Sequence, residues 1–479
     1  MSTTDNGLRS GLKWNSIAQL LNQVSVFITG FILMRLLTPE DFGLVAIVTV
    51  FLGFSQLFTN VGLSSSIINQ KNVSKYDYDN IFTFSLMIGS IMALLMYIFS
   101  NPLASFFDDH RLAILFQIAA IALFISPLGA IPAAILKRKL HFKALAIINI
   151  ISTFISLGIA IGMAYYDYGY YSLIAQKLIY LTLNIVLVFI VSKYIPYLWF
   201  SFKNLKGHLN FGIPILGSKI INYSIGNLDN FLIGKFLGTS SLGYYGRAFS
   251  IVTIPSTRIG LIINSTMFPV FSNMKNRNVD IKNSVLKLFE LILYVLFLLA
   301  LLYVISSRSL IQIISPDGEW DSIIPIIQAL AFVSVFKPII NFYSSILASL
   351  GLTKLSFKTE LIGGLIIGIG FMVGVNFSLL NFSFIYCISS LLFFAYYSII
   401  FSKILKLNRL DLFNLFKYKL FVFIIVTLVS FVFLNVNFNN PFLELPIGIL
   451  LVIILWFTLN YIFERNTSKF ILKTIKSFI

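Results

Sequence analysis

Long hydrophobic runs, separated by short polar stretches, recur along the whole chain of 479 residues. A membrane helix needs roughly 20 mostly apolar residues, and the sequence holds about fourteen such runs. The predicted spans are 14–37, 42–66, 80–99, 112–136, 144–166, 170–191, 211–236, 244–271, 285–306, 323–349, 357–376, 382–402, 419–435 and 442–463. The pattern predicts an all-α, polytopic membrane protein, and no stretch remains for a soluble domain.

The stretch 211–260 departs from this pattern, because charged and amide side chains lie inside two adjacent spans. A charge at the centre of a membrane helix costs about 3 kcal/mol, so residues of this kind usually face a polar cavity or a partner. Lys219, Asn222, Gly226, Asp229 and Asn230 fall at helical spacing. Steps of three and four return to the same side of a helix, which places these residues on one face. The spacing predicts a polar wall along this span.

The following span and the first span carry similar polar positions. Arg247 and Arg258 lie eleven residues apart, about three helical turns, and therefore share a face. Gln19 and Asn22 form an uncharged polar stripe in the first span. The predicted cavity residues are the cations Lys219, Arg247 and Arg258 and the polar residues Gln19, Asn22, Asn222, Asn227 and Asn230.

Asp229 has two interpretations that the sequence leaves open. It is either a coupling carboxylate or the partner of Arg247 in a structural ion pair across the short turn between the two spans. In both cases one carboxylate does not neutralise three cations. A positively charged, hydrogen-bonding cavity suits an anionic, hydroxyl-rich cargo, because the arginine fork binds phosphate oxygens through paired hydrogen bonds.

The net charge of +17 is typical of nucleic-acid binding, but its placement excludes that class. About 26 of the 35 Lys and Arg residues fall in the loops on the side of the N-terminus, against roughly four on the other side. The positive-inside rule therefore predicts that both termini are cytoplasmic. With one cysteine and three scattered histidines, no metal site is expected, and the absence of GxSxG, HExxH and P-loop motifs argues against an enzyme.

Three short sequences recur in the same order in the two halves of the chain. RLLTPEDFGL (35–44) matches KFLGTSSLGY (235–244) at an offset of 200 residues, and KLHFK (139–143) matches KLSFK (354–358); a third, looser match follows the third and ninth spans. A duplicated unit of six spans would place both copies in the same orientation. The alternative is that short basic loops share similar requirements. The duplication predicts three domains, 1–201, 202–409 and 410–479.

Several segments resemble a known family, the bacterial polysaccharide transporters. The segments that carry the resemblance are GLKWNSIAQ (11–19), LLTPEDFGL (36–44), GLSSSIINQK (62–71), FGIPILGSKIINYSIGNLDNFLIGKFLG (211–238), YGRAFSIVTIPSTRIG (245–260) and GEWDSIIPIIQAL (318–330). They are similar to Wzx-like lipid-linked oligosaccharide flippases of the multidrug/oligosaccharidyl-lipid/polysaccharide exporter superfamily, in the branch that includes the colanic-acid exporter.

The resemblance implies a V-shaped pair of six-helix bundles with two additional helices, working by alternating access in the bacterial plasma membrane. The implied cargo is an undecaprenyl-diphosphate-linked repeat unit for O-antigen, capsule or exopolysaccharide assembly, with a polysaccharide polymerase and chain-length machinery as partners. No cofactor is implied, although some members use an H⁺ or Na⁺ gradient. The matching positions are Lys219, Arg247 and Arg258, with Asp229 as the coupling or pairing carboxylate.

Three other functions remain open at this stage. A cation-coupled drug antiporter of the same superfamily would need essential carboxylates, which this chain hardly offers. A membrane-embedded polymerase or ligase would need catalytic residues on a large outer loop, and the longest outer segments are short. An assembly subunit with no transport activity would rarely need charges at the centre of the membrane.

Overall fold

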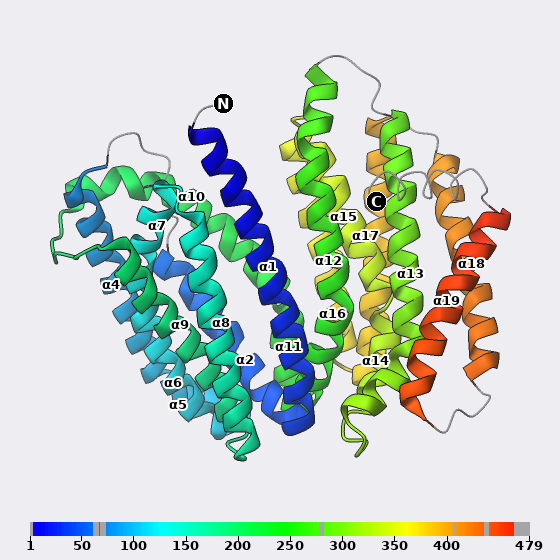
Figure 1. Cartoon of the computed structure of the whole chain (residues 1–479), viewed down its shortest axis with the longest axis horizontal. Coiled ribbons are helices and arrows are strands. Elements are labelled where there is room, and N and C mark those ends of the chain that lie inside the picture. Colours follow the sequence, from blue (N-terminus) through cyan, green and yellow to red (C-terminus); the bar gives the residue numbers. More distant parts are fainter. Residues whose placement is uncertain are drawn as a thin grey trace. The chain divides into compact units, whose positions relative to one another are not determined.

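The computed structural model describes residues 3–60, 67, 73–276, 282–406, 409–434 and 440–463. Helices make up nearly all of these residues, and no strand occurs among them (Figure 1). The chain divides into two compact units, Met1–Gly243 (unit 1) and Tyr244–Ile479 (unit 2). The domain division predicted after residue 201 concerns the repeated sequence pattern and stays a prediction.

Unit 1 contains six helical segments that are long and apolar enough to cross a membrane, followed by further helices. Its elements are α1 (Thr3–Leu36), α2 (Pro39–Asn60), α4 (Lys75–Ile98), α5 (Ser100–Phe106), α6 (Arg111–Ile125), the 3-10 turn η1 (Ser126–Gly129), α7 (Ala130–Arg138), α8 (Phe142–Tyr165), α9 (Tyr170–Ser192), α10 (Phe202–Gly226), α11 (Leu228–Phe236) and the start of α12 (Thr239–Asn276). Helices α6, η1 and α7 follow one another without a gap and form one segment. Pro127 lies in the 3-10 turn that joins α6 to α7.

Unit 2 is built around a large aromatic core. Its elements are the rest of α12, α13 (Lys282–Ile314), α14 (Ile323–Leu330), α15 (Val333–Ser349), α16 (Thr353–Gly374), α17 (Leu379–Ile404), α18 (Arg409–Leu434) and α19 (Pro441–Phe463). Phe289, Tyr343 and Phe401 are fully buried, and the rings of Tyr343 and Phe401 stack with centroids 4.2 Å apart. Stacked and edge-on aromatic pairs of this kind hold α13, α15 and α17 together.

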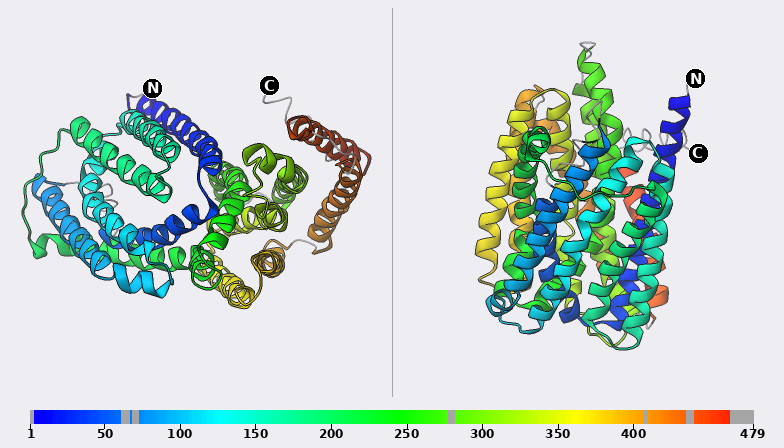
Figure 2. Two further views of the ribbon diagram at one scale, coloured as in Figure 1. Left: turned by 90° about the horizontal axis from the view of Figure 1, so that it is seen from below. Right: turned by 90° about the vertical axis from the view of Figure 1, so that its left-hand side faces the viewer.

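Eleven helical segments in the described part of the chain are long and apolar enough to cross a membrane. Within each unit these helices run side by side along a common direction (Figure 2). They coincide with eleven of the fourteen predicted spans, and the other three, 211–236, 244–271 and 419–435, fall on α10–α11, α12 and α18. The prediction of an all-α, multi-pass membrane protein is confirmed.

The connections of unit 1 lie at two opposite ends, which differ in charge. We call them the Asp41 end (connections 37–38, 107–110, 166–169 and 237–238) and the Lys139 end (73–74, 139–141 and 193–201). The charged side chains that the structure describes at the Lys139 end are Lys75, Lys137, Arg138, Lys139, Lys143 and Lys193 with Asp77 and Asp79. Those at the Asp41 end are Glu40, Asp41, Asp108, Asp109 and Asp167 with Arg35, Arg111 and Lys235.

The first turns of α2 and α12 contact each other through two glycines. A Cβ atom added to Gly43 would lie 1.8 Å from the carbonyl oxygen of Thr239, and one added to Gly243 would lie 1.7 Å from that of Pro39. The contact is reciprocal, because Gly43 and Gly243 are 200 positions apart, as are Pro39 and Thr239, which is the offset of the repeated sequences. The glycines at these positions allow the two backbones to touch.

Candidate functional site

The polar stretch 211–236 does not form the single continuous helix that the sequence predicts. The helix breaks at Asn227, whose backbone dihedral angles are φ −125° and ψ 9°, and its amide Nδ2 donates a hydrogen bond to the Tyr223 carbonyl at 2.9 Å. Gly226 immediately before it favours a break, because glycine has a low helix propensity. The predicted polar face therefore divides into an α10 part with Lys219 and an α11 part with Asp229.

The two parts differ in exposure. On α10, Lys219 and Asn222 are exposed, and Asn222 Nδ2 donates to the Ser218 carbonyl at 2.9 Å. On α11, Asp229 is only 4% exposed, and its Oδ1 accepts a hydrogen bond from the backbone N–H of Asn230 at 2.8 Å. A buried carboxylate in a membrane helix is a candidate functional group, and the choice between a coupling carboxylate and an ion-pair partner of Arg247 stays open for Asp229.

Tyr223 fixes the second half of α10 to α2. Its hydroxyl donates to the Val50 carbonyl at 2.9 Å and lies against Gly53, where an added Cβ would be 2.2 Å from the hydroxyl oxygen. Tyr223 is not among the residues that the sequence predicts for the site, because tyrosines are frequent in this chain and a single glycine 170 residues away gives no signal of contact.

A pocket of about 230 Å³ lies beside the break between α10 and α11. Its lining is mostly apolar and comes from α2 and from both sides of the break. The lining residues are Val50, Phe51, Phe54, Tyr223, Ser224, Asn227, Leu228 and Phe231. Of the predicted cavity residues, Asn227 is the one that lines this pocket.

The other predicted site residues are distributed over both units. On α1, Gln19 is exposed, and Asn22 Oδ1 is buried without a hydrogen-bond partner among the described residues. Arg247 is half-buried in the part of α12 that belongs to unit 2. Arg258 also falls on α12, but its side chain lies outside the described part of the structure. Shared cavity lining by these residues, and an Asp229–Arg247 ion pair, stay predictions.

Lys177 lies within the predicted span 170–191. The structure shows its Nζ donating to Thr49 Oγ1 at 2.8 Å, which joins α9 to α2. The two residues are 128 positions apart, and sequence spacing gives no indication of their contact.

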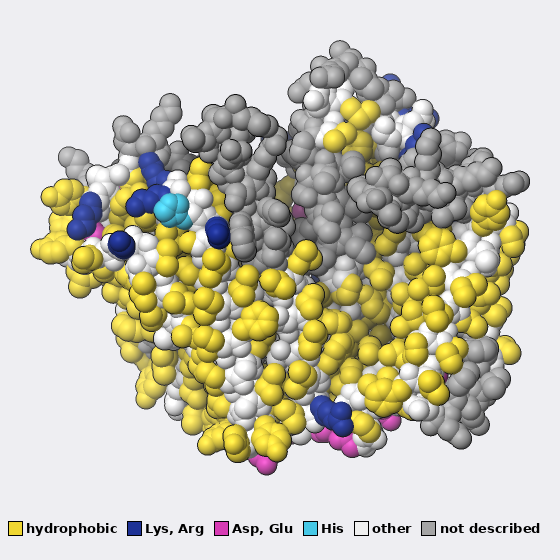
Figure 3. Space-filling model, viewed as in Figure 1, with side chains coloured by type: hydrophobic (Ala, Val, Ile, Leu, Met, Phe, Trp, Pro, Cys, Tyr) yellow, Lys and Arg dark blue, Asp and Glu magenta, His cyan; other side chains and the backbone are white. Residues whose placement is uncertain are grey.

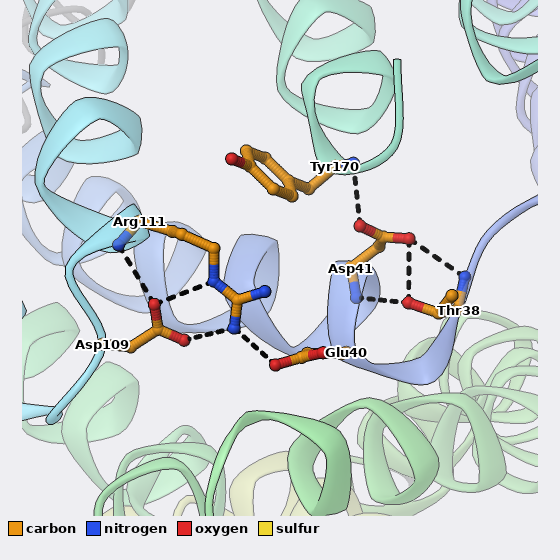
Figure 4. Close-up of polar contacts among 6 residues, drawn as sticks. All are labelled: Thr38, Glu40, Asp41, Asp109, Arg111 and Tyr170. Atoms are coloured by element: carbon orange, nitrogen blue, oxygen red, sulfur yellow. Dashed lines mark hydrogen bonds and ion pairs between the residues drawn. The ribbon is translucent and has the colours of Figure 1, made fainter. Parts of the chain in front are cut away.

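The Asp41 end of unit 1 carries a hydrogen-bonded cap that links two helices (Figure 4). Asp41 Oδ2 accepts from the backbone N–H and the hydroxyl of Thr38 at 3.0 and 2.9 Å, and the N–H of Asp41 donates back to Thr38 Oγ1 at 3.3 Å. This is the capping-box pattern, with an aspartate in the third helical position. Asp41 Oδ1 also accepts from the N–H of Tyr170 at 3.0 Å, which joins α2 to the start of α9.

Beside this cap, Arg111 joins α6 to α2 (Figure 4). Its Nη2 and Nε bind both oxygens of Asp109 at 2.7 and 3.0 Å, and Nη2 also forms an ion pair with Glu40. The hydrogen bond from Arg111 lowers the pKa of Asp109, although partial burial opposes the shift. Lys235 makes a further ion pair with Asp108 at 2.9 Å and thereby ties α11 to the connection after α5.

We expect Arg111→Gln to lower the free energy of unfolding by about 1 kcal/mol at neutral pH, as for partly exposed ion pairs. Because Arg111 lowers the pKa of Asp109, this stabilisation is present above the ordinary pKa of 3.8 and is lost as the pH falls through the lowered value. Thermal unfolding of the purified protein from pH 7 to pH 3, with the exposed Arg35→Gln as control, would measure it. If Arg111→Gln lowered the stability by the same amount at pH 7 and at pH 3, the ion pair between Arg111 and Asp109 would not be the source of the stabilisation.

The chain is similar in sequence to known proteins of one family. The sequence profile described as polysaccharide biosynthesis protein matches residues 32–325, which extend across both units. The chain belongs to this family. Teichuronic acid biosynthesis protein TuaB of Bacillus subtilis is 27% identical over 411 residues, 85% of each chain. Lipopolysaccharide biosynthesis protein WzxC of Escherichia coli is 22% identical over 351 residues, 73% of this chain and 71% of that protein.

Solved structures place this family member in a fold shared with transporters. The lipid II flippase MurJ, in an inward closed conformation, matches 94% of this chain and 99% of its own, with a TM-score of 0.70 and 17% identity. A multidrug resistance transporter of the MATE family, in an inward-facing conformation, matches 80% of this chain and 95% of its own, with a TM-score of 0.60 and 16% identity. The predicted resemblance to the polysaccharide family is confirmed.

Proposed function

We propose that this protein is a flippase that moves an undecaprenyl-diphosphate-linked oligosaccharide repeat unit from the cytoplasmic to the outer leaflet of the bacterial plasma membrane. The observation that carries the proposal is that a member of the polysaccharide biosynthesis family has the fold of a lipid II flippase. TuaB and WzxC, whose names assign them to teichuronic acid and lipopolysaccharide biosynthesis, support a glycan cargo. The product would enter O-antigen, capsule or exopolysaccharide assembly.

In this proposal transport proceeds by alternating access, with both termini in the cytoplasm. Lys219, Arg247 and Arg258 bind the diphosphate, because paired cations offset the desolvation of an anion that enters the membrane. The lipid tail stays in the bilayer and the sugars cross along the polar residues. Asp229 either couples transport to an H⁺ or Na⁺ gradient or balances the cations. No bond is made or broken, so no catalytic residue is required, and a polymerase and chain-length machinery receive the product.

The test is a deletion strain that receives the wild-type gene, Arg258→Ala, Lys219→Ala or the control Lys358→Ala, which removes a cation from the exposed surface of α16. We expect complete lipid-linked repeat units to accumulate facing the cytoplasm in the deletion strain. Wild type and Lys358→Ala should restore surface polysaccharide. The two site variants should reach the same abundance in the membrane but give at least tenfold less surface polysaccharide, which corresponds to about 1.4 kcal/mol or more.

Full transport by both Arg258→Ala and Lys219→Ala would show that these two residues do not bind the cargo. Normal surface glycan in the deletion strain, with no accumulated intermediate, would remove the flippase function in that host. The second candidate, a cation-coupled small-molecule or drug antiporter, is favoured by the MATE-like fold. It predicts that overexpression raises resistance to cationic dyes and that Asp229→Asn abolishes this resistance, since an antiporter for cations requires a carboxylate in its path.

A further inference from the structure

The connection between α9 and α10 is an extended segment that is fixed to the side of α4. We call residues 194–202 the aromatic segment. Its backbone N–H groups at Tyr197, Trp199 and Ser201 donate to Asp79 Oδ1 (3.3 Å), Thr83 Oγ1 (3.1 Å) and Asn80 Oδ1 (2.8 Å). The segment is therefore held at every second residue.

Two further hydrogen bonds complete this attachment. Asn80 Nδ2 donates to the Ser201 carbonyl at 2.9 Å, so the amide of Asn80 pairs with both backbone groups of Ser201, as a neighbouring strand would. The hydroxyl of Tyr194 donates to Asp79 Oδ1 at 2.5 Å, and burial together with this hydrogen bond raises the pKa of Tyr194. Asp79 and Asn80 are 3% and 1% exposed, so buried polar groups serve to hold a connecting loop.

The side chains that this attachment leaves exposed are apolar. Ile195 is 77% exposed, Leu198 67% and Tyr197 66%, and Phe202 at the start of α10 is 63% exposed. A loop in water is usually polar, and an apolar patch of this size on a fixed backbone indicates a surface that contacts a membrane or another protein.

The position of these hydrogen bonds along α4 favours a membrane, and not another protein, as the partner of the exposed apolar side chains. The aromatic segment begins two residues after α9, a membrane-crossing helix, and contacts residues 79–83 of α4. Since α4 starts at Lys75, these contacts lie about 6–12 Å along the helix from its first residue, at 1.5 Å per residue. Interfacial segments lie about 5–10 Å into the boundary between headgroups and acyl chains, and Trp and Tyr are enriched at that depth.

Cations flank the aromatic segment and give it a preferred lipid. Lys193 precedes it and is exposed, and Lys75 is exposed beside Tyr76, whose ring contacts that of Trp199 with centroids 5.7 Å apart. In Figure 3, Lys and Arg side chains gather at the upper left, above a hydrophobic surface, where Figure 1 places the ends of α4 and α7. The nearby acids, Asp77 and Asp79, are engaged in the α4 cap and in the attachment. The surface is therefore cationic at its rim and apolar at its centre.

We propose that the aromatic segment is an interfacial anchor that binds the surface of an anionic phospholipid leaflet at the Lys139 end of unit 1. Ile195, Leu198 and Phe202 enter the boundary between headgroups and acyl chains, while Lys75 and Lys193 contact the lipid phosphates. The hydrogen bonds that the segment donates to Asp79, Thr83 and Asn80 keep it flat against α4, so that its apolar side chains face the lipid as one surface. This inference concerns the leaflet itself and does not depend on the cargo.

The depth of the segment can be measured with single cysteines in a Cys387→Ser background, which removes the native cysteine. Leu198→Cys would carry an environment-sensitive fluorophore in vesicles with and without phosphatidylglycerol. Phe154→Cys, exposed on α8 near its middle, is the deep control, and His141→Cys, exposed in the connection after α7, is the aqueous control. We expect a nitroxide on the lipid headgroup to quench the probe at position 198 most strongly. A nitroxide within the acyl chain should quench the probe at position 154 most strongly, and iodide in the water should quench the probe at position 141 most strongly.

Iodide quenching of the Leu198 probe equal to that of His141 would overturn the proposal, because the segment would then lie in water. Protection from all three quenchers would overturn it as well, since a protein and not lipid would cover the surface. Both outcomes are readable in a folded protein, because Leu198 is exposed and its replacement removes no contact in the core.

The lipid preference is tested separately with Lys75→Gln/Lys193→Gln. Each Lys near an anionic surface contributes to binding, and we expect the double variant to bind phosphatidylglycerol about tenfold more weakly by native mass spectrometry. The control, Arg35→Gln/Lys235→Gln, removes two charges at the Asp41 end and should leave this binding unchanged. Equal binding by the Lys75/Lys193 variant and wild type would show that the anchor does not select anionic lipid.

Discussion

Replacing Gly43 or Gly243 by alanine is expected to destabilise unit 1 strongly, although the change adds only one methyl group. The new Cβ would lie 1.8 or 1.7 Å from a backbone carbonyl oxygen, a distance that no side-chain rotation relieves. The first turns of α2 and α12 would have to separate. Added methyl groups in close-packed sites cost about 1–3 kcal/mol, and we expect the upper part of that range because both contacting groups are backbone.

The matched control is Gly246→Ala, three residues further along α12, where an added Cβ meets nothing within 4 Å. It should be neutral or slightly stabilising, since alanine has the higher helix propensity. The measurement is the melting temperature of the purified protein, together with its abundance in the membrane. If Gly43→Ala, Gly243→Ala and Gly246→Ala melt alike, the close crossing of the two helices is wrong.

The double variant adds a second test of the crossing. Both substitutions act on one contact, so a helix pair already separated by Gly43→Ala has room for the second methyl group. We expect the Gly43→Ala/Gly243→Ala variant to lose clearly less stability than the two single losses added together. Additive losses would indicate two independent contacts.

The sequence predicts the spans well, because a bilayer leaves few alternatives to a helix of about 20 apolar residues. The repeated segments 35–44 and 235–244 contain Gly43 and Gly243, but the repeat does not predict that these glycines contact Thr239 and Pro39. The pattern Thr-x-x-Asp at residues 38–41 is a capping-box signature, and the structure shows the box, although it was not among the sequence predictions.

Sequence spacing cannot predict contacts between distant elements. The sequence does not predict the break at Asn227, because polar residues recur at helical intervals on both sides of it. One residue with a non-helical backbone leaves this spacing almost unchanged. Likewise, Arg111 meets Glu40 across 71 positions and Lys177 meets Thr49 across 128. The candidate cavity residues belong to this class, since their common role depends on how separate helices are placed.

Lys419 illustrates the same limit in unit 2 and leads to the second prediction. The sequence places it at the first residue of the predicted span 419–435, whereas the structure places it within α18, ten residues after the helix begins, with no exposed surface. Its Nζ donates to Asn460 Oδ1 on α19 at 3.1 Å and lies 5.2 Å from the centroid of the Tyr294 ring on α13. A basic residue near a span end thus joins three helices.

We expect Asn460→Leu to lower the free energy of unfolding by about 3 kcal/mol, because it removes a hydrogen bond from a buried ammonium group whose charge stays in place. The double variant Lys419→Met/Asn460→Leu should recover most of this loss, since an apolar pair of similar volume leaves no buried charge. A double-mutant cycle measured by chemical unfolding in detergent, with Lys419→Met alone as its fourth corner, gives the coupling between the two residues. A double variant as unstable as Asn460→Leu would show that packing of the Asn460 side chain, and not compensation of the Lys419 charge, holds α18 and α19 together.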